Sequence, residues 1–109
     1  MTRIAVAVDE EGVALCMGKA ARFVVLSSED GRTDDRTTRF DPEAHGESGD
    51  GGRGRRLARL FSDCDVVIAG SMGPGISAHL AEMGIEAVET GRTSVDEAVA
   101  EYLARPRAG

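Results

Sequence analysis

Short apolar runs alternate with polar and glycine-rich segments along this chain, and their spacing predicts an α/β fold. Three runs are apolar over most of their length, which is typical of strands buried on both faces of a sheet. These runs are residues 3–8 (RIAVAV), 23–26 (FVVL) and 65–69 (DVVIA). The polar segment 28–31 predicts a turn, and residues 33–40 predict an edge strand after it. Residues 85–88 predict a last, short strand.

Three helices are predicted, over residues 55–61, 74–83 and 94–103. The first two carry apolar side chains at helical spacing. The second begins with Pro74 and ends before Gly84, a common residue at a helix C-terminus. Its apolar stripe consists of Ile76, Leu80 and Met83. The third helix opens with the capping box S-x-x-E.

The order of these elements, β-β-β-α-β-α-β-α, predicts a mixed five-stranded sheet in a single domain over residues 1–109. We expect the first three strands to form an antiparallel meander and the strands of the later β-α-β unit to be parallel. If the first and fourth strands are neighbours, the loops 9–21, 41–54 and 70–75 meet at one edge of the sheet. Ligands of open α/β sheets bind outside such strand ends.

The charge and cysteine content narrow the classes of function. The chain carries 19 acidic and 13 basic residues, a net charge of −6, which repels nucleic acid and anionic membranes alike. We therefore expect neither as a partner. The two cysteines, Cys16 and Cys64, form no CxxC pair, and the N-terminal residues contain no signal peptide or membrane span. These features predict a cytoplasmic protein.

Two of the predicted loops carry side chains suited to metal chemistry. Cys16 and Met17 place a thiol beside a thioether, and soft sulfur ligands select copper(I), zinc or iron–sulfur species. The neighbouring Lys19 favours the thiolate form of Cys16. His45 stands among glycines, where an imidazole can act as a metal ligand on a flexible arm. The alternatives are that both sulfur side chains pack beneath the loop and that His45 is merely exposed.

Features that bind anions accompany these side chains. The turn 70–75 (GSMGPG) presents backbone N–H groups at a predicted helix N-terminus, although a tight strand-to-helix connection explains the same residues. Arg53 begins a basic cluster with the arginines at 55, 56 and 59, which is either a solvated helix face or the counter-charge of an anionic ligand. His79 and Cys64 are interpreted as structural residues.

The sequence lacks the motifs of the common enzyme classes. It contains no GxSxG, HExxH, Walker A or GxGxxG motif. Asp9, at the end of the first strand, would suit a two-metal nuclease only if further carboxylates converged on it. We therefore expect a protein that binds through its loops and is not an enzyme.

Several segments together match one known family. They are Asp9, residues 18–23 (GKAARF), the glycine-rich loop with His45, residues 65–75 (DVVIAGSMGPG), residues 83–85 and residues 94–103 (SVDEAVAEYL). On these residues the chain resembles the dinitrogenase iron–molybdenum cofactor biosynthesis family, which is related to carriers of nitrogenase cofactor precursors and to the molybdenum–copper orange protein. The resemblance implies a ribonuclease-H-like fold with a five-stranded sheet. It also implies a role in nitrogen fixation and cluster binding without turnover.

The first loop departs from the pattern of this family. Where the family commonly has His-Phe-Gly-Arg, this chain has Cys16, Met17, Gly18 and Lys19. The histidine that is usually proposed as a cluster ligand is therefore Cys16 here. Because thiolate and imidazole prefer different metals, the substitution bears on which metal is bound.

The leading hypothesis is a non-catalytic carrier of an iron–sulfur or molybdenum–iron/copper–sulfur cluster, with cofactor-assembly or client proteins as its partners. Cys16 and His45 are the expected metal ligands. The residues expected to hold the rest of the cofactor are Gly18, Lys19, Arg53, Gly70, Ser71 and Gly73. Two other classes of function stay open. One is an interaction or regulatory module that has lost the cofactor, and the other is a residual metal-dependent nuclease suggested by analogy of fold.

Overall fold

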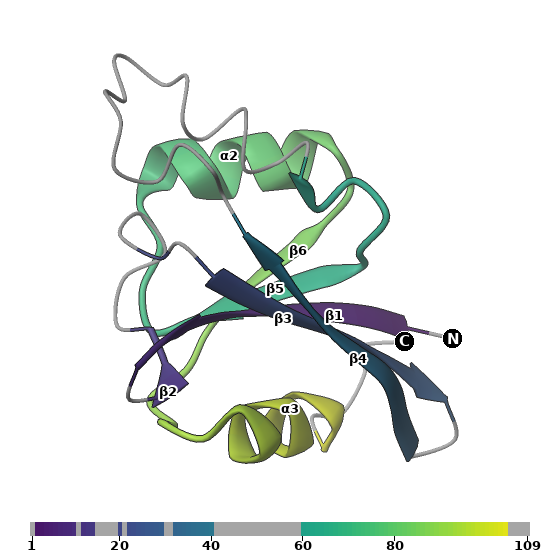
Figure 1. The fold of residues 1–109 in the computed structure, drawn as a ribbon. Helices are drawn as coiled ribbons and strands as arrows, with labels where there is room; N and C mark the ends of the chain where they lie inside the picture. The colour runs from purple at the N-terminus through teal and green to yellow at the C-terminus, as the bar shows by residue number, and fades with distance from the viewer. Residues whose placement is uncertain are drawn as a thin grey trace.

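The computed structural model describes residues 2–10, 12–14, 20, 22–29, 32–40 and 60–104. In this part of the chain a mixed sheet lies between two helices, α2 (Pro74–Glu82) on one face and α3 (Val95–Leu103) on the other (Figure 1). The strands are β1 (Thr2–Asp9), β2 (Gly12–Val13), β3 (Arg22–Glu29), β4 (Arg32–Phe40), β5 (Val66–Ala69) and β6 (Glu86–Glu89). Neither described helix has the length and apolar content needed to cross a membrane.

The strand order agrees with the predicted topology. β4, β3 and β1 form an antiparallel meander, whereas β1, β5 and β6 run parallel. The order across the sheet is therefore β4-β3-β1-β5-β6, with β1 at the centre. The polar segment that predicts an edge strand is β4, and its exposed residues lie at one edge of the sheet.

The strands differ from the prediction in their number and in their bounds. The sheet has six strands instead of five, because the two-residue β2 folds back on β1 and pairs Gly12 with Asp9. The sequence predicts a turn from Ser28 onward, but β3 continues to Glu29 and pairs Ser28 with Thr33. Pairing across the hairpin thus extends the strand through residues that favour turns in isolation.

The structure bears on two further predictions, the three helices expected from the sequence pattern and the ribonuclease-H-like fold implied by the resemblance. The described residues contain two helices, α2 and α3. The helix predicted over residues 55–61 lies outside them, apart from Leu60 and Phe61. The mixed α/β architecture is confirmed, and the ribonuclease-H-like assignment stays a prediction.

Alternate residues of β1 enter two hydrophobic clusters, one on each face of the sheet. Ala5 and Ala7 face α2, whereas Ile4 and Val6 face α3, and all four are fully buried. This burial on both faces explains why β1 is continuously apolar. The α2 cluster consists of Ala5, Ala7, Ala14, Ala20, Phe23, Val25, Phe61, Cys64, Val67, Ala69, Leu80 and Ile85. The α3 cluster consists of Ile4, Val6, Val13, Leu26, Val66, Ile68, Val88, Ala98 and Val99.

The C-terminus of α2 is closed by backbone hydrogen bonds. The N–H of Ile85 donates to the carbonyl oxygen of Leu80 at 2.9 Å, and the N–H of Gly84 donates to Ala81 at 3.0 Å. This is the Schellman pattern, and Gly84 has the φ of +76° that the pattern requires. Gly84 therefore ends the helix as predicted. Met83, however, is wrongly assigned to the apolar stripe, because it lies at the C-cap and is 43% exposed.

Candidate functional site at the loop edge of the sheet

The strands that precede the three predicted loops end at the same edge of the sheet. Val8 near the end of β1 pairs with Arg22, and Arg22 pairs with Phe40 at the end of β4. On the other side of β1, Val6 pairs with Ile68 in a parallel ladder, so β5 ends at this same edge of the sheet. We call this side of the sheet the loop edge. Its strand ends are Asp9, Phe40, Ala69 and Glu89.

Backbone hydrogen bonds join the first loop to the turn that follows β5. The N–H of Ala14 donates to the carbonyl oxygen of Ala7 at 2.8 Å, which holds the start of this loop against β1. The carbonyl oxygen of Ala14 in turn accepts from the N–H of Gly70 at 2.8 Å. Ala14 precedes Cys16 by two residues in the sequence. The loop that bears Cys16 therefore leaves the sheet directly beside the turn 70–75.

The segment that follows β6 also supports the first loop. The N–H of Val13 donates to the carbonyl oxygen of Thr93 at 2.8 Å. Gly12 has a φ of +129°, and a Cβ on this residue would lie 2.1 Å from the same oxygen of Thr93. Both the backbone conformation and the close approach require glycine at this position. β2 is thus fixed between β1 and the segment that leads into α3.

The turn from Gly70 to Gly75 presents bare backbone at the start of α2. The N-cap residue Gly73 makes no side-chain hydrogen bond, and the first turn of the helix contains no acidic residue. A Cβ on Gly73 or Gly75 would meet no atom within 4 Å, and neither residue has a positive φ. Glycine is therefore required here neither by conformation nor by packing. The absence of side chains at Gly73 and Gly75 leaves room beside the backbone at the start of α2.

The start of α3 shows the opposite arrangement. The Ser94 hydroxyl oxygen accepts from the N–H of Glu97 at 3.3 Å, which confirms the serine half of the predicted capping box. Asp96 and Glu97 also place negative charge in the first turn. At this end the helix itself supplies an acceptor for the Glu97 amide and negative charge for the positive end of the helix dipole. Of the two described helices, α2 is the one whose N-terminus can accept an anion from outside.

The structure describes only part of the predicted site. Gly70, Ser71 and Gly73 lie at the loop edge, where Gly70 is bonded to the first loop. The other predicted residues are outside the described part of the chain: Cys16, Gly18, Lys19, His45 and Arg53. Within the described part, no cluster of three or more His, Cys, Asp or Glu side chains could hold a metal ion. The assignments of metal ligands therefore stay predictions.

Cys64 is confirmed as a core residue. Its side chain belongs to the α2 cluster and is buried. Burial raises the pKa of the thiol to about 11, and the nearby carboxylate of Asp63 acts in the same direction. The thiol donates to that carboxylate with Sγ 3.7 Å from Oδ1. Because the thiolate is the form that binds metals, Cys64 is poorly suited to be a ligand.

Asp63 links two strands to the segment that precedes β5. The guanidinium of Arg39 on β4 donates to both carboxylate oxygens, each at 2.7 Å. Arg3 on β1 donates to the same carboxylate at 3.0 Å. The hydrogen bond from Arg39 is the main reason why the pKa of Asp63 lies well below its usual range. His79, also interpreted as structural, is half-buried on α2, with Nδ1 3.7 Å from the carboxylate of Glu82.

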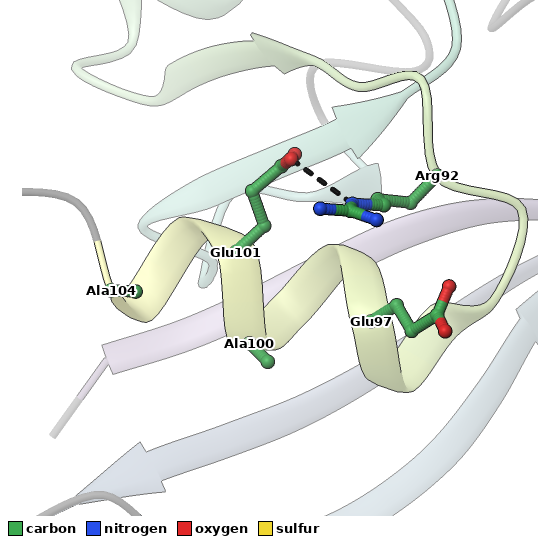
Figure 2. Close-up of a pocket in the computed structure, with 5 residues that line it drawn as sticks. All are labelled: Arg92, Glu97, Ala100, Glu101 and Ala104. Carbon is green, nitrogen blue, oxygen red and sulfur yellow. Dashed lines mark hydrogen bonds and ion pairs between the residues drawn. The ribbon is translucent and has the colours of Figure 1, made fainter.

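A surface hollow of about 510 Å³ lies beside α3 (Figure 2). Its lining consists of Arg92, Glu97, Ala100, Glu101 and Ala104. Arg92 Nε donates to the Glu101 carboxylate at 3.2 Å, and the Thr90 hydroxyl donates to the same carboxylate at 2.8 Å. These groups connect α3 to the end of β6. None of the described residues that line the hollow belongs to the predicted site, and we interpret its charged groups as structural.

Comparison with known proteins identifies the family. The profile of the dinitrogenase iron-molybdenum cofactor family matches residues 1–105. The chain belongs to this family. The match spans the loop edge and also the loops that carry the predicted ligands, so it confirms the resemblance seen in the sequence. No match was found among curated proteins.

Several solved structures share this fold. The crystal structure of PH0822 has a TM-score of 0.74 and 20% identity, and the match covers 99% of this chain and 96% of that chain. The MJ0327 protein of Methanocaldococcus jannaschii has a TM-score of 0.72 and 11% identity, over 93% and 86%. The apo form of the orange protein from Desulfovibrio gigas has a TM-score of 0.71 and 25% identity, over 94% and 88%. The first two similarities establish the fold alone.

Proposed function

We propose that this member of the dinitrogenase iron-molybdenum cofactor family binds and carries a metal–sulfur cluster or cofactor precursor at the loop edge, without catalysing a reaction. Family membership supports a role connected with the cofactor. The observation that carries the proposal is the hydrogen bond between Gly70 and Ala14, because it joins the turn 70–75 to the start of the loop that contains Cys16. We propose that the protein works in the cytosol and passes its cargo to assembly or client proteins.

The proposed roles follow from the chemistry of the side chains. Cys16, with His45 as a second donor, would ligate the metal, since thiolate and imidazole both bind soft and borderline metals. Lys19 and Arg53 would neutralise the negative charge of a sulfide-rich cluster. Gly18, Gly70, Ser71 and Gly73 would let the backbone approach the cargo closely, and the N–H of Gly73 would donate to its sulfur atoms.

The described part of the site fits an anionic cargo. The amides of Gly75 and Ile76 lie in the first turn of α2, where no intrahelical acceptor exists for them, and the N-cap Gly73 offers no side chain in its place. The positive end of the helix dipole adds to this preference for negative charge. A metal–sulfur cluster that bears net negative charge would supply an acceptor for these amides.

Anaerobic reconstitution tests the proposal. The purified protein is incubated with copper(I) and tetrathiomolybdate, or with iron(II) and sulfide, and the bound metal is quantified after gel filtration. We expect the wild type and the control variant Cys64→Ala to retain metal in a fixed stoichiometry and to show a charge-transfer absorbance, whereas Cys16→Ala loses both. If Cys16→Ala retains metal in the same stoichiometry, Cys16 is not a ligand. No uptake by the wild type with either mixture would contradict the carrier function and favour an interaction module.

A further inference from the structure

A carboxylate of the protein itself accepts a hydrogen bond from one backbone amide of the proposed site. The N–H of Met72, in the middle of the turn 70–75, donates to Oε2 of Glu89 at 2.9 Å. Glu89 is the last residue of β6, and it pairs with Ala69 at the end of β5. Register places the two residues side by side, although they are 20 positions apart in the sequence. No motif in the sequence points to this contact.

The orientation of Glu89 is set by the alternation of β6. Val88 packs in the α3 cluster, so the next residue points to the α2 side of the sheet. The backbone of this segment is held by a hydrogen bond of 2.9 Å from the N–H of Thr90 to the carbonyl oxygen of Ala69. On the other side of the contact, the half-buried Met72 packs against the α2 cluster. Both partners are therefore anchored, and the carboxylate is held at the turn.

This contact bears directly on the charge of the cargo. The first turn of α2 contains no acidic residue, and Glu89 brings a negative charge to its N-terminus from a different element. A negative charge is favourable beside the positive end of a helix dipole when no other anion is present. When an anionic cargo enters, the same charge repels it, and the carboxylate competes for the Met72 amide.

We propose that Glu89 is an internal counter-anion that weakens the binding of anionic cargo at the turn 70–75 and thereby favours its release. This inference rests on the proposed function, because it concerns the affinity of the same site. A carrier must give up what it binds, and a tethered carboxylate can replace the departing anion at the Met72 amide. Glu89 is thus a residue that sets affinity, not a ligand of the cargo.

Substitution of Glu89 by glutamine tests the role of its charge. Gln keeps an oxygen that can accept from the Met72 N–H, so Glu89→Gln removes the charge and preserves the hydrogen bond. Glu82→Gln is the matched control, because Glu82 is exposed at the opposite end of α2 and its loss changes the net charge equally. The probe is tetrathiomolybdate, a dianion, titrated anaerobically and followed by its absorbance and by equilibrium dialysis.

We expect Glu89→Gln to bind tetrathiomolybdate roughly fivefold or more tightly than the wild type, the size expected for removing one charge at close range in water. The control Glu82→Gln should bind like the wild type. The difference should shrink in about 1 M salt, where charges are screened within a few ångströms.

The possible results separate this inference from the proposed function. If the wild type binds the probe and Glu89→Gln binds it equally or more weakly, the counter-anion role is overturned while the carrier function stands. If neither protein binds tetrathiomolybdate, alone or with copper(I), this inference is overturned, and the proposed function is overturned with it when iron and sulfide are not taken up either. Tighter binding by both glutamine variants to the same extent would assign the effect to net charge and overturn the specific role of Glu89.

Discussion

The backbone N–H of Gly70 donates a hydrogen bond of 2.8 Å to the carbonyl oxygen of Ala14. These residues belong to segments that are 56 positions apart in the sequence, the entry to the first loop and the turn after β5. The bond forms because β1 and β5 are parallel neighbours whose carboxyl ends lie at the same edge. It joins the start of the loop that contains Cys16 to the turn before α2, so that both belong to one candidate site.

Gly12→Ala should destabilise the protein and disturb the first loop. The new Cβ would meet the carbonyl oxygen of Thr93, and alanine would have to adopt a φ of +129°. We expect a loss on the order of 1–3 kcal/mol in the free energy of unfolding, measured by urea denaturation. Gly91→Ala is the control, since a Cβ there meets no atom within 4 Å. Equal stability of both variants would show that β2 is not fixed against Thr93.

Gly75→Ala should separate stability from binding. The residue lies in the first turn of α2 with open space around it, so alanine should leave stability unchanged or raise it by about 0.4–1 kcal/mol. The added methyl group covers the amides of the turn, and we therefore expect weaker binding of tetrathiomolybdate. Thermal unfolding and an anaerobic titration measure the two effects. A variant that binds as well as the wild type would exclude the turn from the cargo site.

The buried thiol of Cys64 should make the protein less stable at alkaline pH. Its pKa is raised from 9.0 to about 11 in the folded state, mainly by burial. Between these values the unfolded chain has released the proton and the folded chain still binds it, so the free energy of unfolding falls as the pH rises. We expect a decline on the order of 1–3 kcal/mol that Cys64→Ala lacks. Parallel stability curves of both proteins between pH 9 and 11 would refute this assignment.

The carboxylate of Asp63 should contribute stability that is lost in acid. Its hydrogen bond with Arg39 lowers the pKa of the folded carboxyl group, so this contribution is present above the ordinary carboxyl pKa of about 4 and decreases as the pH falls below it. Because the pair is partly exposed, Asp63→Asn should cost only about 0.5–1 kcal/mol at neutral pH. Unfolding between pH 2 and 7 measures the difference. Glu10→Gln, which removes an exposed carboxylate outside this cluster, controls for net charge.

Much of the fold was predictable because its strands are continuous apolar runs. The segments around Val6, Val25 and Ile68 have no other favourable location than a sheet covered on both faces. β2 could not be predicted in this way, since two residues, Gly12 and Val13, are too few to show a periodicity. They pair with β1 only because the chain reverses direction after Asp9. Met83 was assigned to the core by helical spacing, but the chain has already left the helix there.

The candidate site was predictable only as a set of loops. The order of the strands indicates which loops meet, and the turn with Gly73 is recognisable as a possible anion site. Glu89 carries no such signal, because its contact with Met72 depends on the register of β6 against β5 and on the direction of one side chain. Contacts of this kind follow from tertiary structure and cannot be derived from local sequence.

The most direct test of one shared site is a two-dimensional ¹H–¹⁵N NMR titration of the labelled protein with tetrathiomolybdate, with and without copper(I). We predict that the amide signals of Gly73, Gly75 and Cys16 shift together and saturate at the same ratio of ligand to protein. The signals of Glu97 and Ala100, which line the hollow beside α3, should stay in place. Saturable shifts confined to α3, or shifts at Cys16 that leave Gly73 and Gly75 unchanged, would contradict a shared site at the loop edge.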